Sequence, residues 1–193
     1  MYIIRVLYWC AHGHANFPFT TFVHNKEFSF DALTKKLVRK MIIAITGGRG
    51  FIGNFLVKKH LSKGHQVRIL SRKVLPQNNK YDTFIGDLTN PKVDLSSFLD
   101  DVDILYHCAG EVINESIMRE LHVKGTKRLV DAAKGHVGRI VQLSSVGSYG
   151  PYRDGLISEQ SKEKPLGLYE ITKTESDDVI KSCGIPYVIL RPS

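Results

Sequence analysis

The sequence predicts an α/β protein built on a doubly wound parallel sheet with helices on both faces. From Met41 onward, short apolar runs alternate with longer helical stretches along the 193-residue chain. Strands that are apolar without alternation are typical of a sheet buried on both faces, and therefore of parallel strands. Glycines at 64, 135 and 184 each follow a helical stretch, where a left-handed helix end is expected.

The expected elements follow this rhythm in order. Six apolar runs predict strands at residues 42–45, 66–70, 83–85, 104–107, 139–143 and 187–190. Helices are predicted between them at residues 51–62, 95–99, 116–134 and 168–182.

Residues 1–40 do not continue this alternation of strands and helices. They are interpreted as an N-terminal extension, and the domain is expected to span residues 41–193. Within the extension, residues 17–23 predict a strand and residues 30–40 a short helix. A cysteine and three histidines suggest metal binding, but no second ligand cluster follows, so no metal site is predicted. These four residues are Cys10, His12, His14 and His24.

Composition narrows the class of protein. The chain is 42% apolar and 24% charged, as in ordinary soluble domains. The net charge of +8 suggests nucleic acid, but residues 41–193 mix 21 basic with 17 acidic side chains and contain no basic block. A solvated basic surface is the preferred interpretation, with no nucleic-acid partner.

Cysteine usage and hydropathy predict a cytoplasmic protein with no membrane partner. Three widely spaced cysteines, Cys10, Cys108 and Cys183, give no disulfide framework. No apolar run approaches the roughly 20 residues needed to cross a bilayer. Arg5 interrupts the apolar N-terminus, and no clean cleavage site follows, so a secretory signal is not predicted.

The glycine-rich stretch at residues 46–53 is the strongest local signal. It lies between an expected strand and an expected helix, an arrangement that presents bare backbone N–H groups to a pyrophosphate. Gly47, Gly50 and Gly53 allow the turn, the approach of the phosphates and close helix packing. The sequence therefore predicts dinucleotide binding here.

A proton-transfer site is predicted from three residues downstream. Ser145 follows an expected strand, and Tyr169 and Lys173 lie four residues apart on one face of an expected helix. The carboxyl edge of a parallel sheet is where ligands bind. We expect the lysine to lower the pKa of the tyrosine, which exchanges a proton with the substrate while the serine polarises the same oxygen.

Seven elements occur in an order that resembles a known family. They are Thr46–Gly53 (TGxxGxxG), Gly86–Leu88, His107–Gly110 (HxAG), Val123–Thr126 (VxGT), Ser145, Tyr169 with Lys173 (YxxxK) and Leu190–Pro192 (LRP). With them, residues 41–193 resemble the extended short-chain dehydrogenase/reductases, also called the NAD-dependent epimerase/dehydratase family. His122 departs from the family pattern, in which asparagine is usual.

The resemblance implies a Rossmann-like fold, a nicotinamide cofactor and a set of site residues. Ser145, Tyr169 and Lys173 would be catalytic, Lys173 would also hold the nicotinamide ribose, and Asp87 would contact the adenine. The implied cofactor contacts are Gly47, Arg49, Gly50, Phe51, Ile52, Gly53, Arg72, Asp87, Leu88, Ala109 and Lys173.

The expected cofactor is NAD(P), with NADP(H) modestly favoured. Family members that prefer NAD usually carry an acid at the end of the second strand. Here residues 70–73 read Leu-Ser-Arg-Lys, and Arg72 with Arg49 would suit a 2′-phosphate. The competing interpretation is that both arginines are simply exposed.

The resemblance implies an epimerase or reductase that acts on a nucleotide-activated sugar. A 4,6-dehydratase is not expected, because residues 145–147 read Ser-Val-Gly where such enzymes carry two acids. Cys108 and His107 are expected to be packing residues rather than catalysts. The alternatives left open are a ketosteroid- or flavonoid-type alcohol dehydrogenase, a non-catalytic dinucleotide-binding protein and an inactive fragment.

Two expectations concern the whole protein. The chain stops where the family continues into its substrate-binding region, so we expect a fragment truncated at the C-terminus. A homodimer through the helices at 116–134 and 168–182 is left open by the resemblance.

Overall fold

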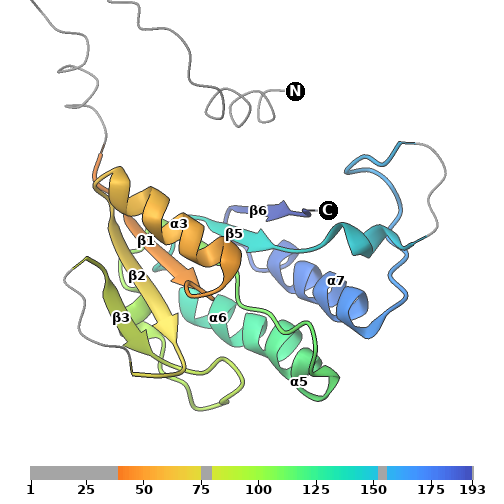
Figure 1. Ribbon diagram of the computed structural model, residues 1–193, viewed down its shortest axis with the longest axis horizontal. Coiled ribbons are helices and arrows are strands. Elements are labelled where there is room, and N and C mark those ends of the chain that lie inside the picture. Colours follow the sequence, from red (N-terminus) through yellow and green to blue (C-terminus); the bar gives the residue numbers. More distant parts are fainter. Residues whose placement is uncertain (1–38, 75–79, 152–155, 193) are drawn as a thin grey trace, which may run out of the picture. The chain divides into compact units, whose positions relative to one another are not determined.

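The computed structural model describes residues 39–74, 80–151 and 156–192, which contain a six-stranded sheet (Figure 1). Its strand order is β3-β2-β1-β4-β5-β6, and every neighbouring pair is parallel. The strands are β1 (Ile42–Thr46), β2 (Gln66–Ser71), β3 (Asp82–Ile85), β4 (Ile104–His107), β5 (Ile140–Leu143) and β6 (Tyr187–Leu190). The predicted fold class is confirmed, and each predicted strand is present within one residue at either end.

The strand order reverses between β1 and β4. The chain runs outward from β1 to β3 and then returns to place β4 on the other side of β1. Connections on the two sides diverge at such a point, which opens a crevice at the carboxyl ends of the strands. The glycine turn after β1 and the loop after β4 lie at this position (Figure 1).

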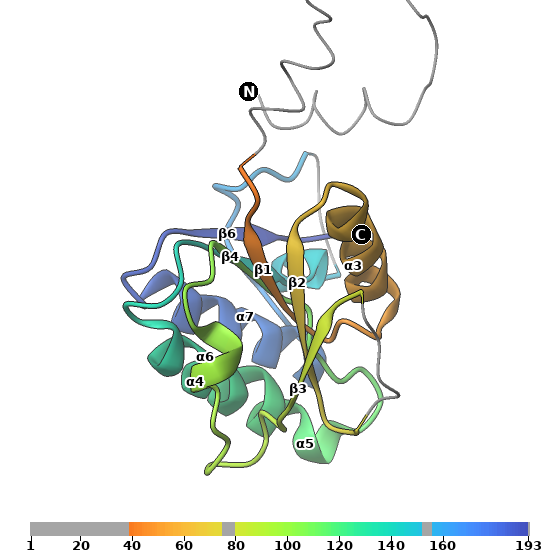
Figure 2. The same cartoon turned by 90° about the vertical axis from the view of Figure 1, so that its left-hand side faces the viewer.

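Helices cover the two faces of the sheet unequally (Figure 2). Helix α3 (Phe51–Ser62) packs on one face, against Ile43 and Ile45 of β1. The other face carries a larger core that includes Phe98 and Leu105. Its helices are α4 (Ser96–Leu99), α5 (Glu115–Arg119), α6 (Thr126–Ala133) and α7 (Leu168–Lys181).

The predicted single helix over 116–134 is wrong in its centre. Between α5 and α6, residues Glu120–Gly125 form a π-helical turn, η1, which buries His122 and Gly125. A π turn inserts one extra residue, and this does not change the apolar pattern enough to be read from sequence. A second short element, the 3₁₀ turn η2 (Val146–Tyr149), follows β5.

The helix ends agree with the sequence. Gly64, Gly135 and Gly184 have φ angles of +77°, +80° and +77°, which confirms the predicted left-handed positions.

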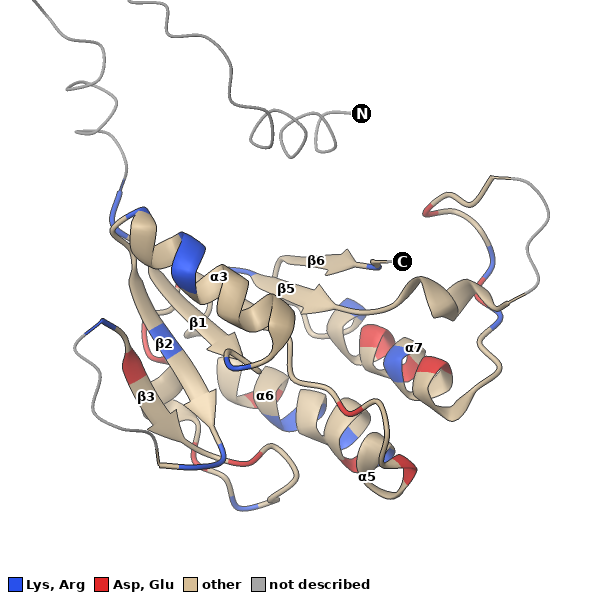
Figure 3. Ribbon diagram, in the orientation of Figure 1, with Lys and Arg blue, Asp and Glu red and all other residues tan. Residues whose placement is uncertain are grey.

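Lys and Arg are interspersed with Asp and Glu over the described residues (Figure 3). The strand and metal interpretation within residues 1–38, and nearly all of the predicted helix at 30–40, lie outside the described residues. None of the helices in the described ranges is long and apolar enough to cross a bilayer.

Candidate active site

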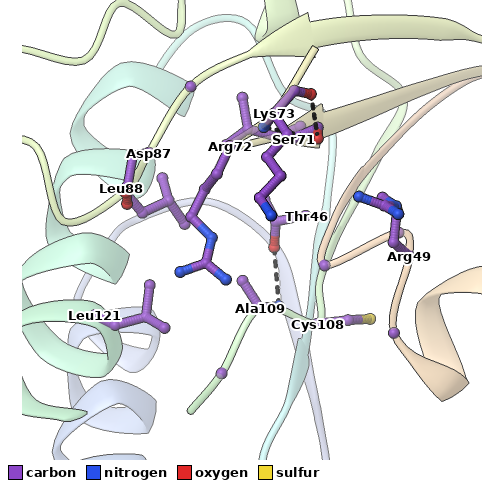
Figure 4. A pocket seen from close by; sticks show the side chains of 16 residues that line it. Thr46, Arg49, Ser71, Arg72, Lys73, Asp87, Leu88, Cys108, Ala109 and Leu121 are labelled. Atoms are coloured by element: carbon purple, nitrogen blue, oxygen red, sulfur yellow. Dashed lines mark hydrogen bonds between the residues drawn. The ribbon is translucent and has the colours of Figure 1, made fainter. Parts of the chain in front are cut away.

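A cavity of about 410 Å³ opens where the strand order reverses (Figure 4). Four segments and Leu121 of η1 line it; the segments are the glycine turn after β1, the end of β2, the loop after β3 and the loop after β4. This is the crevice that the fold provides for a ligand.

Two glycines in the turn are required by its geometry. Gly47 has a φ of +66°, and a Cβ there would lie 2.7 Å from the carbonyl carbon of Cys108. A Cβ on Gly53 would lie 2.2 Å from the carbonyl oxygen of Gly47. The turn is therefore pressed between the end of β4 and the start of α3, as the sequence predicted for glycines at these positions.

The N-terminus of α3 points its unpaired N–H groups at this turn. Gly50 is the N-cap residue, no side chain caps the helix, and its first turn contains no acid. The side chains of Phe51 and Ile52 are 97% and 36% exposed and do not line the cavity. Their contribution to a cofactor would come from backbone N–H groups, which favour phosphate at a helix start.

The cavity wall is positively charged. Arg49, Arg72 and Lys73 line it, and Asp87 is the one acid among the lining residues that the structure describes. The Lys73 N–H donates to Ser71 Oγ (3.2 Å), and the Ser71 hydroxyl donates to the Lys73 carbonyl (2.8 Å). This closed turn presents Arg72 and Lys73 to the cavity (Figure 4). Such a wall suits phosphate groups.

Asp87 is held in one orientation. The N–H and hydroxyl of Thr89 both donate to Asp87 Oδ1, at 2.9 and 2.8 Å. Two donors on one oxygen fix the carboxylate, and its second oxygen is left to accept from a ligand. Across the cavity, the Ala109 N–H donates to Thr46 Oγ1 (3.2 Å), which joins the ends of β4 and β1 (Figure 4).

The lining contains most of the cofactor contacts that the sequence implied. These are Gly47, Arg49, Gly50, Arg72, Asp87, Leu88 and Ala109. Sequence reasoning did not assign Thr46, Gly48, Leu70, Ser71, Lys73, Gly86, Cys108, Gly110 and Leu121. Most of these flank a predicted contact and could have been found by extending each motif. Leu121 could not, because its position depends on the π turn.

Ser145 and Tyr169 lie on the elements that follow β5. Ser145 Oγ accepts the Gly147 N–H at 3.1 Å, so the hydroxyl proton remains available to a substrate oxygen. Tyr169 is half-buried in the first turn of α7. Burial raises its pKa, and the nearby Glu170 carboxylate raises it further. The expected lowering of the Tyr169 pKa by Lys173 is therefore wrong, because burial of the phenol outweighs it.

Lys173 is 3% exposed, and its charge acts on the thiol of Cys108 in the cavity wall. Burial lowers its pKa to about 8, against the opposing influence of Asp177 and Cys108. Cys108 lines the cavity, and burial raises the pKa of its thiol to about 11 despite the Lys173 charge. The thiol stays protonated at neutral pH, in agreement with the expectation that it is not a nucleophile.

His107 is a buried packing residue, as predicted. Its Nδ1 lies 2.7 Å from Thr46 Oγ1 and its Nε2 lies 2.9 Å from Thr126 Oγ1. Burial, with Lys173 and His122 nearby, lowers its pKa to about 3, so the ring is neutral. It joins β1, β4 and α6 beneath the cavity.

Known proteins resemble the chain in sequence. A family model, the NAD dependent epimerase/dehydratase family, matches residues 43–193. A putative dihydroflavonol 4-reductase of Synechocystis sp. is 31% identical over 166 residues, which are 77% of this chain and 48% of that protein. An uncharacterized UDP-glucose epimerase of Bacillus subtilis, YtcB, is 29% identical over 180 residues, 78% of this chain and 55% of its own length.

Solved structures agree. WbmG of Bordetella bronchiseptica, in complex with NAD, has a TM-score of 0.70 at 25% identity and is matched over 80% of this chain and 54% of its own. The UDP-glucuronic acid 4-epimerase of Bacillus cereus, also with NAD, has a TM-score of 0.66 at 26% identity, over 78% and 55%. The chain thus spans about half the length of these relatives. It belongs to the NAD dependent epimerase/dehydratase family.

Proposed function

We propose that the cavity binds a nicotinamide dinucleotide and that the chain catalyses hydride transfer between this cofactor and a nucleotide-activated sugar, as an epimerase or reductase. Tyr169 is the acid/base, Ser145 polarises the reacting oxygen, and Lys173 holds the nicotinamide ribose. One observation carries the proposal. The cavity is lined by the glycine turn before α3 and by the cations Arg49, Arg72 and Lys73, a combination that suits the phosphates of a dinucleotide.

Structures of similar proteins support the substrate class. WbmG is known in complex with NAD and UDP, and the Bacillus cereus epimerase with UDP-glucuronic acid and NAD. Because this chain spans about half of each, the substrate of the whole protein is part of the proposal. The absence of acids at residues 145–147 argues against a 4,6-dehydratase.

NADP(H) is the favoured form of the cofactor in this proposal. The support is the cationic wall of Arg49, Arg72 and Lys73, and the lack of an acid at the end of β2. The NAD complexes among the similar structures make NAD the competing cofactor.

The second candidate is an alcohol dehydrogenase of the ketosteroid or flavonoid type. Its support is the similarity to the dihydroflavonol reductase and to a 3-beta-hydroxysteroid dehydrogenase of Mycolicibacterium neoaurum, 34% identical over 116 residues. A non-catalytic dinucleotide-binding protein, or an inactive fragment, is less favoured because Ser145, Tyr169 and Lys173 are all present.

The proposal also includes a cytoplasmic location and a homodimer. The free thiols of Cys108 and Cys183 suit the reducing cytoplasm. A homodimer would form through the helices near residues 116–134 and 168–182, which correspond to the segment from α5 to α6 and to α7.

A single-turnover experiment tests the function. The chain is mixed with NAD or NADP and either UDP-glucose or UDP-glucuronic acid, and reduced nicotinamide is followed by its absorbance. Tyr169→Phe should keep cofactor affinity and slow hydride transfer by roughly 10²- to 10⁴-fold. The control is Tyr187→Phe, at an exposed position on β6. Equal rates in both variants would remove Tyr169 from the mechanism.

A further inference from the structure

His122 lies in the π turn η1 and is 1% exposed. It stands where the family pattern has asparagine, and the proposed function assigns it no role. A π turn inserts one extra residue into a helix, and such turns occur at functional sites more often than elsewhere. Here the turn places an imidazole between the cavity wall and α7.

Both ring nitrogens of His122 are hydrogen-bonded, and the bonds define the tautomer. The Glu111 N–H donates to Nε2 at 2.9 Å, so Nε2 carries no proton. The proton is on Nδ1, which donates to Thr172 Oγ1 at 2.8 Å. Burial, followed by the influence of Lys173, lowers the pKa of the ring to about 4, so this neutral form is the one present at neutral pH.

The two hydrogen bonds of His122 connect it to the cavity wall on one side and to the first turn of α7 on the other. Glu111 follows Gly110, which lines the cavity, and a Cβ on Gly110 would lie 3.6 Å from His122 Nε2. The Thr172 hydroxyl contacts the carbonyls of Leu168 (2.8 Å) and Tyr169 (3.1 Å) in the first turn of α7.

The ring also contacts Tyr169 directly. The two ring centroids are 5.7 Å apart and the planes meet at 82°, an edge-to-face arrangement. His122 therefore interacts with the first turn of α7 in two ways. Its hydrogen bond to Thr172 connects it to the backbone carbonyls of that turn, and its ring packs edge-to-face with the ring of Tyr169.

We propose that His122 is a positioning residue that fixes the Tyr169 ring and the first turn of α7 against Glu111, the residue after Gly110 of the cavity wall. The proposal rests on the proposed function, in which Tyr169 is the acid/base. An asparagine has the donor and the acceptor but no ring, and a phenylalanine has the ring but neither bond. Histidine is the residue that supplies both.

The test uses the phenol of Tyr169 as the reporter. The chain is labelled with ¹³C at the tyrosine ring, and the Tyr169 signal is assigned by its loss in Tyr169→Phe. The phenol is titrated in the wild type, in His122→Asn and in His122→Phe. The matched control is His65→Asn, because His65 is also buried and accepts the Met41 N–H through Nδ1 at 3.3 Å.

We expect His122→Asn to move the Tyr169 titration to lower pH, because removal of the ring admits water to the half-buried phenol. His122→Phe should weaken NADPH or NADH binding by roughly fivefold, the equivalent of one lost hydrogen bond at the cavity wall. His65→Asn should change neither. Unchanged Tyr169 titration and cofactor affinity in two folded His122 variants would overturn the proposal.

A measurement on the wild-type chain keeps the test decisive if both variants unfold. ¹⁵N-histidine spectra should show one neutral ring protonated at Nδ1, with a nuclear Overhauser contact to Tyr169. A ring protonated at Nε2, or one without that contact, would also overturn the proposal. The phenol titration needs neither cofactor nor substrate, so it tests the role of His122 by itself. A failure of the proposed function would appear separately, as a wild-type chain that binds neither NADH nor NADPH.

Discussion

Lys173 and Asp177 lie one helical turn apart on α7, and both are buried, at 3% and 0% exposed. Asp177 Oδ2 accepts the Ser144 hydroxyl at 2.7 Å and Arg191 Nη2–H at 2.9 Å. Its charge opposes the lowering of the Lys173 pKa that burial causes. The buried carboxylate thus supports the positive charge of the lysine at the site and ties the end of β6 to α7.

The first prediction follows from this pair. Asp177→Asn should lower the pKa of Lys173 further, because the opposing charge is removed. It should also destabilise the fold by about 3 kcal/mol, because the buried ion pair between Asp177 and Arg191 is broken. Lysine ¹³C spectra over a pH titration and urea unfolding measure the two effects.

The control for this pair is the next residue along α7. Asp178 has an exposed carboxylate bound to Lys181, so Asp178→Asn should cost less than about 1 kcal/mol and leave Lys173 unchanged. Similar losses in the two variants would show that the buried position of Asp177 has no special importance.

The fold could be predicted because its signals are local. Continuous apolar runs marked the strands, and glycines such as Gly64 and Gly135 marked helix ends that require positive φ. The glycine turn was predicted for the same reason: a Cβ at Gly47 or Gly53 would meet backbone atoms. Local requirements of this kind are visible in the sequence.

Features that depend on packing were not visible. The π turn moves His122 and Leu121 inward, and nothing in the apolar spacing distinguishes it from an α turn. The pKa of Tyr169 was predicted in the wrong direction because sequence spacing shows the lysine but not the burial of the phenol. How buried a charge or a phenol is depends on the neighbouring elements, which spacing along one helix cannot give.

The second prediction concerns the cofactor. Arg72 lines the cavity on the turn that Ser71 closes, so Arg72→Ala should weaken NADPH binding by roughly tenfold and change NADH binding little. Titration of cofactor fluorescence measures both affinities. Arg139→Ala is the control. Arg139 is exposed and precedes β5, so it lies at the amino ends of the strands, whereas the cavity lies at their carboxyl ends. Equal effects on the two cofactors would contradict recognition of the 2′-phosphate.

The third prediction tests the glycine turn. A Cβ at position 53 would lie 2.2 Å from the Gly47 carbonyl oxygen, so Gly53→Ala must displace α3 from the turn. We expect a destabilisation of roughly 1 to 3 kcal/mol and loss of cofactor binding. Asn54→Ala, at the next and exposed position of α3, should preserve both. If Gly53→Ala bound NADPH normally, the close packing of helix and turn would not be needed for the site.

The last prediction is a loss of stability in mild acid. Burial, with the His65 and Lys63 charges, lowers the pKa of His60 to about 4, whereas an imidazole in the unfolded chain titrates near 6.5. Between these values the unfolded state binds the proton and the folded state does not, so the free energy of unfolding falls as the pH falls.

For His60 alone the difference between pH 7 and pH 5 is about 1 to 2 kcal/mol. His107 and His122, with pKa values lowered to about 3 and about 4, add to it in the same direction. Urea midpoints at the two pH values measure the sum. His60→Leu should flatten the dependence without touching the site, because His60 Nδ1 is buried with no hydrogen-bond partner among the described residues. If the slope survived this change undiminished, His60 would have the same pKa in the folded and the unfolded chain, and its lowered pKa would be contradicted.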